Sequence, residues 1–599
     1  MAQHSQLSTP TICSRRGGDT ARQTPCGQGS RARSTLLSRR PVVGLRGIAW
    51  CLALCCCLIG GRDDRRARAE TATPDLPDTP LPASHPAAEP PAFSLIGLGD
   101  SLTHGTMDGT NNATNSLQAY LQKIADSLRQ VTTLHFSQPL FDVQQERLRP
   151  FQVPTNLGVD GADAFSLEGL SYYKRAGVGE SFITPAYLGD ALLPRRLDDK
   201  YDKVLYPINV LSRQAVSQLD ATIWHLEQTA AEGGGKVLLM FWVGNNDSST
   251  AALGSGGENP SYFPIPLAQI SPEITPSLRL ALQAAWQQGV LSFDAYTTPT
   301  IERNLTALGD FEAQYAHLLA RLHGAGRLDT GQIELFLLTL PYYSSVGYLF
   351  DSDDLEYYLQ KLNPSYRVPP TFARVAPAGA PIDDPLRGDR VSLLTFGLMY
   401  ALLHSDYPTE YVNQVLEMGG QQRDDMVLSE MEQGLIRARI DGFNATITAT
   451  AKAHGPHVHL VDIGRYLNDA LTGVTPVTVD GRTFSRKWIR GGSFTFDGVH
   501  PGYTGQAFVA NFVLGRMNEA LGLNAPLHDL SAVLATDPYV DRDGDGWAPG
   551  PGGQGVGLTE LLLLFKDPDD ADPAAQVRLP ADVWEQISRI LLRELAGIP

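Results

Sequence analysis

Four apolar runs stand at wide intervals along the chain, and none of them alternates with polar residues. They cover residues 93–98, 236–243, 333–340 and 458–463. Strands that are covered by helices on both faces have this continuous pattern, whereas strands with one solvated face alternate. Helical periodicity lies between the runs, for example at residues 210–232 and 301–322. This order predicts an α/β fold with a parallel sheet between helical layers.

Long segments separate the predicted strands. Residues 162–205, 250–300 and 342–425 are each much longer than an ordinary connection and contain many Pro, Gly and Tyr residues. We expect them to form loops and small helices over the carboxyl edge of the sheet. Loops in such positions commonly determine specificity.

Composition predicts four parts in the chain. They are a leader (1–69), a linker rich in Pro and Ala (70–91), an α/β domain with insertions (92–525) and an appended acidic module (526–599). The leader combines many Arg residues with an apolar core of 14 residues at 47–60, which is too short to span a bilayer comfortably. Ala67-Arg68-Ala69 offers a cleavage site. We therefore expect an export signal, with an uncleaved anchor as the alternative, and a periplasmic, secreted or cell-surface location.

The net charge and the positions of the cysteines narrow the class of protein further. The net charge is −17; the leader, with twelve Arg against three acids, has +9, which leaves −26 on the rest of the chain. Such an acidic body does not favour nucleic-acid binding. All six Cys precede residue 58. The body therefore has no disulfide, thiolate nucleophile or cysteine metal site.

Four short polar motifs could supply chemistry. In chain order they are Gly99-Asp100-Ser101-Leu102, Asn156-Leu157-Gly158-Val159-Asp160-Gly161, Gly244-Asn245-Asn246-Asp247 and Asp497-Gly498-Val499-His500. The first and third follow the runs at 93–98 and 236–243, the second follows a short predicted strand, and the fourth precedes a predicted helix at 505–519. Because strand ends converge at one edge of a parallel sheet, the motifs can share one site.

These motifs contain the parts of a serine nucleophile. His500 could take the proton of Ser101, and Asp497, three positions earlier, could hold the other ring nitrogen of the histidine. The backbone N–H groups of Ser101 and Gly161 and the side-chain amide of Asn246 are candidate oxyanion donors. The sequence contains no Gly-x-Ser-x-Gly elbow, which argues against the α/β-hydrolase fold.

The four motifs, in this order, resemble the four blocks of the SGNH (GDSL) hydrolases, over residues 92–523. The resemblance implies a three-layer α/β/α flavodoxin-like sandwich with a five-stranded parallel sheet, and esterase, lipase or related acyl-hydrolase activity. It implies that Ser101 is the nucleophile, Asp497 and His500 complete the triad, and Gly161 and Asn246 are oxyanion donors. Gly158 competes for the second block, but the family spacing from Asn156 favours Gly161.

Several neighbouring residues have simpler explanations. Ser101 alone could be a helix cap, but the other motifs favour a nucleophile. We expect Asp100, Asn245 and Asp247 to be structural, and His104 to line the mouth of the site. His454, His457 and His459 could suggest a metal site, but no acidic or Cys ligand stands at a matching spacing.

The acidic module contains half of a calcium loop. Asp541, Asp543 and Asp545 alternate before Gly546, but the twelfth loop position is Gly552 rather than Glu. Glu560 could close the site, and the segment resembles the thrombospondin type 3-like calcium repeats of exported proteins. We expect structural calcium; the alternative is an Asp/Gly turn that only keeps the surface soluble.

The leading hypothesis is an exported serine ester hydrolase that needs no catalytic cofactor. We expect a lipid or another small carboxylic ester as its substrate, because the insertions carry many apolar and aromatic side chains. A sugar or polysaccharide O-acetyl esterase is the alternative within the class. A non-catalytic, calcium-dependent surface binding protein is the alternative from another class. We expect no nucleic-acid partner and no membrane span in the mature form.

Overall fold

The computed structural model describes residues 92–551, apart from 143–145, 169–199, 214–215, 232–234, 254–300, 302–304, 326–327, 329, 375–386, 405–406 and 418–426. The chain divides into two compact units, Met1–Val43 and Gly44–Pro599, and every described residue belongs to the second. The predicted leader, the linker and Glu560 lie outside the described residues.

A parallel sheet of five strands forms the centre of the described structure. Its order is β2-β1-β3-β4-β7, and every neighbouring pair is parallel. The strands are β1 (Phe93–Gly99), β2 (Leu134–His135), β3 (Lys236–Trp242), β4 (Ile333–Leu338) and β7 (Val458–Val461). The predicted α/β fold with a five-stranded parallel sheet is confirmed. Four strands coincide with the four apolar runs.

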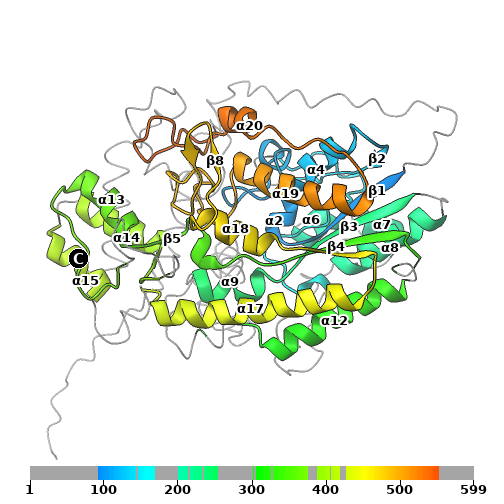
Figure 1. Cartoon of the computed structure of the whole chain (residues 1–599), viewed down its shortest axis with the longest axis horizontal. Coiled ribbons are helices and arrows are strands. Elements are labelled where there is room, and N and C mark those ends of the chain that lie inside the picture. The colour runs from blue at the N-terminus through cyan, green and yellow to red at the C-terminus, as the bar shows by residue number, and fades with distance from the viewer. Residues whose placement is uncertain are drawn as a thin grey trace, which may run out of the picture. The chain divides into compact units, whose positions relative to one another are not determined.

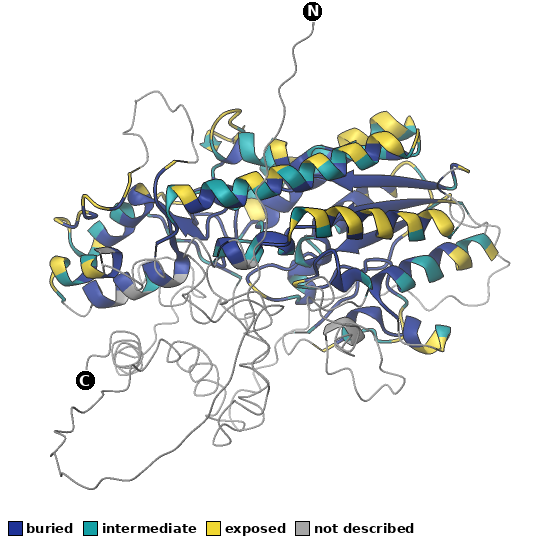
Figure 2. Cartoon of the chain, turned by 90° about the horizontal axis from the view of Figure 1, so that it is seen from below, coloured by how far each residue is buried: buried dark blue, intermediate teal, exposed yellow. Residues whose placement is uncertain are grey.

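Helices lie on both sides of this sheet. Figure 1 shows α4 (Tyr120–Leu128) and α19 (Tyr503–Leu521) on one side, and α8 (Gln218–Ala231), α12 (Leu308–Gly324) and α17 (Glu430–Ala453) on the other. Most residues of the central strands β1, β3 and β4 are buried, and the helices turn their exposed residues outward (Figure 2). Continuous apolar strands need cover on both faces, which explains why β4 has no exposed residue.

The register of the central strands aligns their carboxyl ends. Gly99, the last residue of β1, pairs with Trp242, the last residue of β3. Leu338 at the end of β4 likewise pairs with Val461 at the end of β7. The segments that leave these strands therefore start at one edge of the sheet, where ligands bind in open α/β folds.

The smaller elements lie in the connections between the sheet strands and the long helices. They are α2 (Ser101–His104), α3 (Ala113–Ser116), η1 (Ser166–Glu168), α6 (Lys200–Leu205), α7 (Ile208–Ser212), α9 (Asn246–Leu253), α18 (Ile463–Leu471), β8 (Thr478–Val479) and β9 (Arg482–Thr483). No helix among the described residues is long and apolar enough to cross a membrane.

The insertion between β4 and β7 forms a small helical group. It contains η6 (Tyr343–Ser345), β5 (Leu349–Phe350), α13 (Ser352–Leu362), β6 (Val391–Ser392), α14 (Leu393–His404) and α15 (Thr409–Glu417). Figure 1 shows α13, α14 and α15 together, beside β5. Phe350, Tyr358 and Phe396 pack around Trp488, which belongs to the segment leading to Asp497. The insertion is thus joined to the segment that carries the fourth motif. The other two predicted insertions cover residues 162–205 and 250–300. Most of each, namely residues 169–199 and 254–300, lies outside the described residues.

Polar side chains fix the ends of the helices that border the insertion. The carboxylate of Asp351 caps α13 by accepting from the backbone N–H groups of Asp353 and Asp354, each at 2.9 Å. Ser429 and Glu432 form a capping box at the start of α17. Such caps satisfy backbone donors that have no partner inside the helix.

The described part of the C-terminal segment packs on α19. It contains α20 (Leu530–Thr536), and after it the carboxylate of Asp537 accepts hydrogen bonds from Thr504, from the backbone N at 2.7 Å and from Oγ1 at 2.8 Å. Tyr539 is buried in the main core. Residues 526–551 therefore share the core of the α/β domain.

Candidate active site

Ser101 is the first residue of α2, directly beyond the end of β1. The carboxylate of Asp100 caps this short helix by accepting from the backbone N of Leu102 at 3.0 Å. Gly99 makes the tight passage possible, because a Cβ there would lie 2.3 Å from Oγ1 of Thr103 and 2.5 Å from the carbonyl oxygen of Trp242. Only glycine fits such a close approach. The turn therefore presents Ser101 at the carboxyl edge of the sheet.

Asp497 and His500 stand on a turn that Asp497 itself organises. Its Oδ1 accepts from the backbone N of Val499 and of His500, both at 2.8 Å. Gly498 between them has φ +68°, and a Cβ there would lie 2.6 Å from the backbone N of Tyr348. Glycine is needed at this position for both reasons. The turn brings the carboxylate and the imidazole of one segment side by side.

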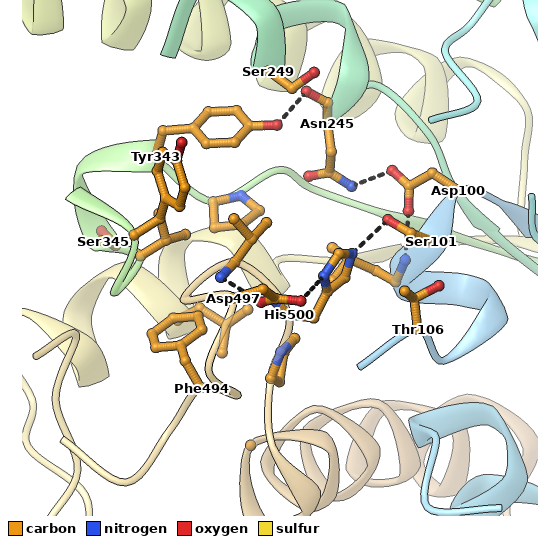
Figure 3. A pocket seen from close by; sticks show the side chains of 18 of the residues that line it. Asp100, Ser101, Thr106, Asn245, Ser249, Tyr343, Ser345, Phe494, Asp497 and His500 are labelled. Carbon is orange, nitrogen blue, oxygen red and sulfur yellow. Dashed lines mark hydrogen bonds and ion pairs between the residues drawn. The ribbon is translucent and has the colours of Figure 1, made fainter. Parts of the chain in front are cut away.

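The three side chains form a continuous hydrogen-bonded series (Figure 3). Nδ1 of His500 lies 2.7 Å from Oδ2 of Asp497, and Nε2 of His500 lies 2.9 Å from Oγ of Ser101. Oδ2 of Asp497 also accepts from the backbone N of Gly109 at 2.9 Å. With Asp497 accepting at Nδ1–H, the neutral imidazole has its lone pair at Nε2, facing the serine. This is the arrangement in which histidine can take the serine proton.

The charges around His500 favour proton uptake by its imidazole. Burial lowers the pKa of His500, but the carboxylate of Asp497, with smaller effects from Asp160 and Asp100, outweighs burial and raises that pKa above its ordinary value. Burial raises the pKa of Asp497, but His500 and the N–H donors of the turn outweigh it and lower the pKa of this carboxyl. Asp497 therefore stays ionised beside an imidazole of increased basicity.

The expected oxyanion donors lie around the same cavity. Ser101, Gly161, Asn246, Asp497 and His500 all line a cavity of about 300 Å³. Gly161 has φ +73°, so the turn at this position favours glycine. The side-chain Nδ2 of Asn246, at the start of α9, donates to the carbonyl oxygen of Ala162 at 3.0 Å. This bond holds the amide against the turn that carries Gly161.

Gly158, unlike Gly161, lies against the backbone of α2 and the residue before it. A Cβ at this position would lie 2.4 Å from the backbone N of His104 and 2.8 Å from the carbonyl oxygen of Asp100. Gly158 therefore lets its loop pack closely against α2, whereas Gly161 lines the cavity. Of the two candidates for the second motif, Gly161 is the one with access to the site.

The expectation that His104 lines the mouth of the site is wrong. His104 is fully buried, and its Nδ1 lies 2.8 Å from the carbonyl oxygen of Gly158. Burial, the largest influence, lowers the pKa of this imidazole. A neutral ring that donates to Gly158 ties the loop of the second motif to α2. The pattern could not reveal this because the two residues come from different motifs.

Asn245 connects two motifs and the insertion. Its Nδ2 donates to Oδ2 of Asp100 at 2.9 Å, and its backbone carbonyl accepts from the hydroxyl of Tyr343 at 2.7 Å (Figure 3). Burial raises the pKa of Asp100 to about 6, against the opposing hydrogen bonds from Asn245 and Leu102. We expected Asn245 and Asp100 to have structural roles. The hydrogen bonds agree with this expectation, because they join neighbouring segments of the chain. The link to Tyr343 had no signal in the sequence.

Asp247 is also structural, as expected. Its Oδ2 accepts from the backbone N of Ala164 at 3.0 Å, and its Oδ1 accepts from Oγ1 of Thr306 at 2.8 Å. These bonds join the start of α9 to two neighbouring segments. Asp247 is not one of the described residues that line the cavity.

His459 of β7 and His457, directly before this strand, share a carboxylate of the neighbouring strand β4. Nδ1 of His457 lies 3.2 Å from Oε1 of Glu334, and Nε2 of His459 lies 2.9 Å from Oε2. Nζ of Lys236 also lies 3.0 Å from Oε1 of Glu334. The sequence offered no acidic neighbour because Glu334 is far away in the chain. Lys236, His457 and His459 therefore share the carboxylate of Glu334.

The acidic residues of the expected calcium loop do gather. One carboxylate oxygen from each of Asp541, Asp543 and Asp545 lies within 4.8 Å of the others. The carboxylate of Asp541 accepts from the backbone N of Gly544 at 2.7 Å and of Gly546 at 2.8 Å, which shapes the loop. Carboxylate oxygens are the ligands that calcium prefers, so the donor set fits this ion. Glu560, which would complete the site, lies outside the described residues.

Comparisons of the chain with protein-family models, with curated proteins and with solved structures found no match. The interpretation of this site therefore depends on its own geometry and on the order of its motifs.

Proposed function

We propose that the protein is an exported serine ester hydrolase of the SGNH (GDSL) type. The observation that carries the proposal is the series from Ser101 through His500 to Asp497, with distances of 2.9 and 2.7 Å. A binding protein has no need for a serine, a histidine and a buried carboxylate in this order. The strand order β2-β1-β3-β4-β7 supports a flavodoxin-like sandwich, because it corresponds to the order 2-1-3-4-5 of that fold.

The reaction proceeds in two halves. Oγ of Ser101 attacks the ester carbonyl carbon while Nε2 of His500 takes the hydroxyl proton. The tetrahedral intermediate collapses, the C–O bond to the alcohol breaks, and His500 gives its proton to the departing oxygen. An acyl-enzyme remains. His500 then takes a proton from water, whose oxygen attacks the acyl carbon, and the proton returns to Ser101 as the carboxylic acid leaves.

The oxyanion is stabilised by donors at the edge of the sheet. The backbone N–H groups of Ser101 and Gly161 and the amide of Asn246 supply hydrogen bonds to the carbonyl oxygen as its charge develops. Asp497 holds the imidazole in the tautomer that accepts at Nε2 and stabilises the imidazolium. This chemistry requires no metal ion, and calcium at Asp541, Asp543 and Asp545 would be structural.

A lipid or other carboxylic ester with an apolar acyl group suits the cavity better than an acetylated sugar. Apolar and aromatic side chains line much of it, among them Trp242, Tyr342, Tyr343, Val346, Leu467, Leu471, Phe494 and Phe508. Burying an acyl chain against such residues stabilises the complex by about 0.8 kcal/mol per CH₂ group. An acetyl group would use little of this surface.

A panel of p-nitrophenyl esters tests the proposal. The protein and its Ser101→Ala variant are compared on acetate, butyrate, hexanoate and octanoate esters, with acetylated xylan as a sugar ester. We expect hydrolysis by the unmodified protein alone, with butyrate or hexanoate preferred over acetate. Equal rates for the two proteins, or no hydrolysis by either, would contradict the proposal. A preference for acetylated xylan would instead support the O-acetyl esterase alternative.

A further inference from the structure

Asp497 and His500 both belong to one short turn, which covers residues 495–500 and is called the catalytic turn below. The backbone N of Thr495 donates to the carbonyl oxygen of His500 at 2.9 Å, and Oγ1 of the same threonine does so at 3.2 Å. These two bonds close the turn, but they do not fix its place relative to β1 and Ser101. The position of the imidazole therefore also depends on the side chains that pack against the catalytic turn from other segments.

Tyr539 packs against the catalytic turn and against the helix after it. It follows α20, which lies beside α19 in Figure 1, and it is only 1% exposed. Its ring centroid lies 5.6 Å from that of Phe496, directly before Asp497, and 5.9 Å from that of Tyr503, the first residue of α19. The interplanar angles of 77° and 81° give the edge-to-face geometry that aromatic pairs favour. One side chain thus contacts the segments on both sides of His500.

The hydroxyl of Tyr539 is linked to the loop that holds the carboxylate of Asp497. It accepts from Nδ2 of Asn115 at 3.3 Å, and Oδ1 of Asn115 accepts from the hydroxyl of Tyr503, also at 3.3 Å. Asn115 belongs to α3, which follows the loop that contains Gly109. The backbone N of Gly109 donates to Oδ2 of Asp497 at 2.9 Å. Tyr539 therefore connects the catalytic turn with the segment on which its carboxylate rests.

Asp537, two residues before Tyr539, fixes the start of α19. Gly502, the residue that precedes this helix, has no side chain that could cap it. Oδ2 of Asp537 accepts instead from the backbone N and from Oγ1 of Thr504, and its Oδ1 accepts from the backbone N of Tyr539 at 3.0 Å. A carboxylate at a helix start satisfies free N–H groups and interacts favourably with the helix dipole. Asp537 thus joins the chain shortly after His500 to the segment of Tyr539.

We propose that Tyr539 and Asp537 are positioning residues of the hydrolase: together they hold the catalytic turn so that Nε2 of His500 stays within reach of Oγ of Ser101. The inference rests on the proposed function and extends the catalytic unit beyond residue 525. Neither residue is among the described residues that line the cavity, so we expect little effect on substrate binding. Loosening the turn reduces the fraction of molecules with an assembled triad. Because acylation and deacylation both use His500, both slow together, so kcat falls while KM changes little.

Replacing the side chain of Tyr539 tests this role. In Tyr539→Leu we expect kcat for p-nitrophenyl butyrate to fall about thirtyfold, with KM within about twofold of the value of the unmodified protein. Tyr539→Phe keeps the ring and loses only the bond to Asn115, so its kcat should fall about threefold. Rates are measured well below the melting temperature of each variant, and circular dichroism in the aromatic region confirms that each is folded.

A buried tyrosine on the other side of the sheet is the matched control. Tyr315 of α12 is fully buried, and its ring packs against Phe241 and Phe311. Tyr315→Leu removes a ring of the same size and should also lower the melting temperature. Its kcat in folded protein should nevertheless stay within about twofold of the original value. If Tyr539 had only a structural role, the two variants would behave alike.

Asp537→Ala tests the second positioning residue. Loss of the carboxylate that caps α19 should lower kcat about tenfold, again with little change in KM. The matched control is Ser429→Ala, which removes the cap of α17 on the other side of the sheet. This control should leave kcat unchanged.

The possible failures are distinct. If hydrolysis depends on Ser101 but folded Tyr539→Leu keeps kcat within about twofold, or Tyr315→Leu loses as much kcat, the inference is wrong and the proposed function stands. If Tyr539→Leu does not fold, Tyr539→Phe decides: a loss of kcat of about threefold at constant KM supports the inference, and an unchanged kcat contradicts it. If Ser101→Ala and the unmodified protein hydrolyse p-nitrophenyl butyrate equally, the proposed function is wrong and the inference fails with it.

Discussion

Nε2 of His500 lies 2.9 Å from Oγ of Ser101, although 399 positions separate the two residues in the chain. Ser101 follows the central strand β1, and His500 stands just before α19, the helix that packs beside α4. The proximity of the pair therefore depends on the whole sheet and on α19. Activity should be lost whenever the domain unfolds, because no local segment can hold both groups.

Asp497→Asn should reduce kcat/KM by about a thousandfold to ten-thousandfold. An amide at this position can donate to Nδ1 of His500, which places the ring proton on Nε2, where it faces the serine and prevents proton uptake. The backbone turn should persist, because an amide oxygen can still accept from the N–H groups of Val499 and His500. Activity on p-nitrophenyl butyrate with an unchanged melting temperature is the measurement. A loss below about tenfold would contradict the assigned role.

The pH profile offers a separate test of the same pair. His500 acts as a base only when neutral, and its pKa is raised mainly by Asp497 against the lowering effect of burial. The acid limb of kcat/KM should therefore lie above pH 6.5, the ordinary pKa of histidine. In Asp497→Asn the residual activity should have its acid limb at lower pH. An acid limb that stays in place would show that the ion pair does not control His500.

Replacing Asp100 should alter how stability depends on pH. Burial raises the pKa of Asp100 to about 6, from 3.8 in the unfolded chain. The folded state thus binds this proton more tightly, and stability is lost as pH rises from about 4 to about 6, by roughly 3 kcal/mol. Asp100→Asn removes this loss. Its free energy of unfolding relative to the unmodified protein should therefore increase over this range, as measured by urea denaturation. A difference that is constant with pH would contradict the burial of a charge at Asp100.

The apolar side chains that line the cavity should determine acyl length. Leu467 of α18 lines the cavity, and Leu467→Trp would fill part of the space. We expect kcat/KM for the octanoate ester to fall about tenfold and that for acetate to change less than about twofold, because only the longer chain needs the filled space. Leu527→Trp is the control, since Leu527 is exposed and does not line the cavity. Equal losses for both esters would place the acyl chain elsewhere.

Calcium, if it binds the loop of Asp541, Asp543 and Asp545, should affect stability more than catalysis. EDTA should lower the melting temperature while the initial rate in still-folded protein changes little, because Ser101 needs no metal. Asp543→Asn should abolish the EDTA effect, since this exposed residue is a proposed ligand. Glu519→Gln, which changes an exposed residue of α19, should leave the EDTA effect unchanged. Loss of rate in folded protein after chelation would mean that the metal has a catalytic role.

The apolar runs and the four polar motifs could be recognised in the sequence. Continuous apolar runs located β1, β3, β4 and β7, because strands buried on both faces leave a strong signal. It did not reveal β2, which has two residues, Leu134 and His135. So short a strand is defined by its pairing with β1 and has no pattern of its own.

Within the site, residue type and order identified the groups to which we assign the chemistry, but not the residues that hold these groups in place. Ser101, Gly161, Asn246, Asp497 and His500 were named from their motifs, and the structure brings them to one cavity. The bond from Tyr343 to Asn245 spans 98 positions, and a pattern in sequence cannot show such a contact. His104 was misplaced for the opposite reason: its position beside the serine suggested access, whereas packing against Gly158 buries it.

Covalent labelling of Ser101 is the most direct test of the central claim. The protein is incubated with a fluorophosphonate, digested and examined by mass spectrometry to locate the adduct. A serine activated by a neutral histidine should react, so we predict a single adduct on Ser101 that forms together with loss of esterase activity. Labelling should be much slower in His500→Gln, where the serine has no base. An unlabelled Ser101 in folded protein, or equal labelling in His500→Gln, would contradict the proposed catalytic role of this serine.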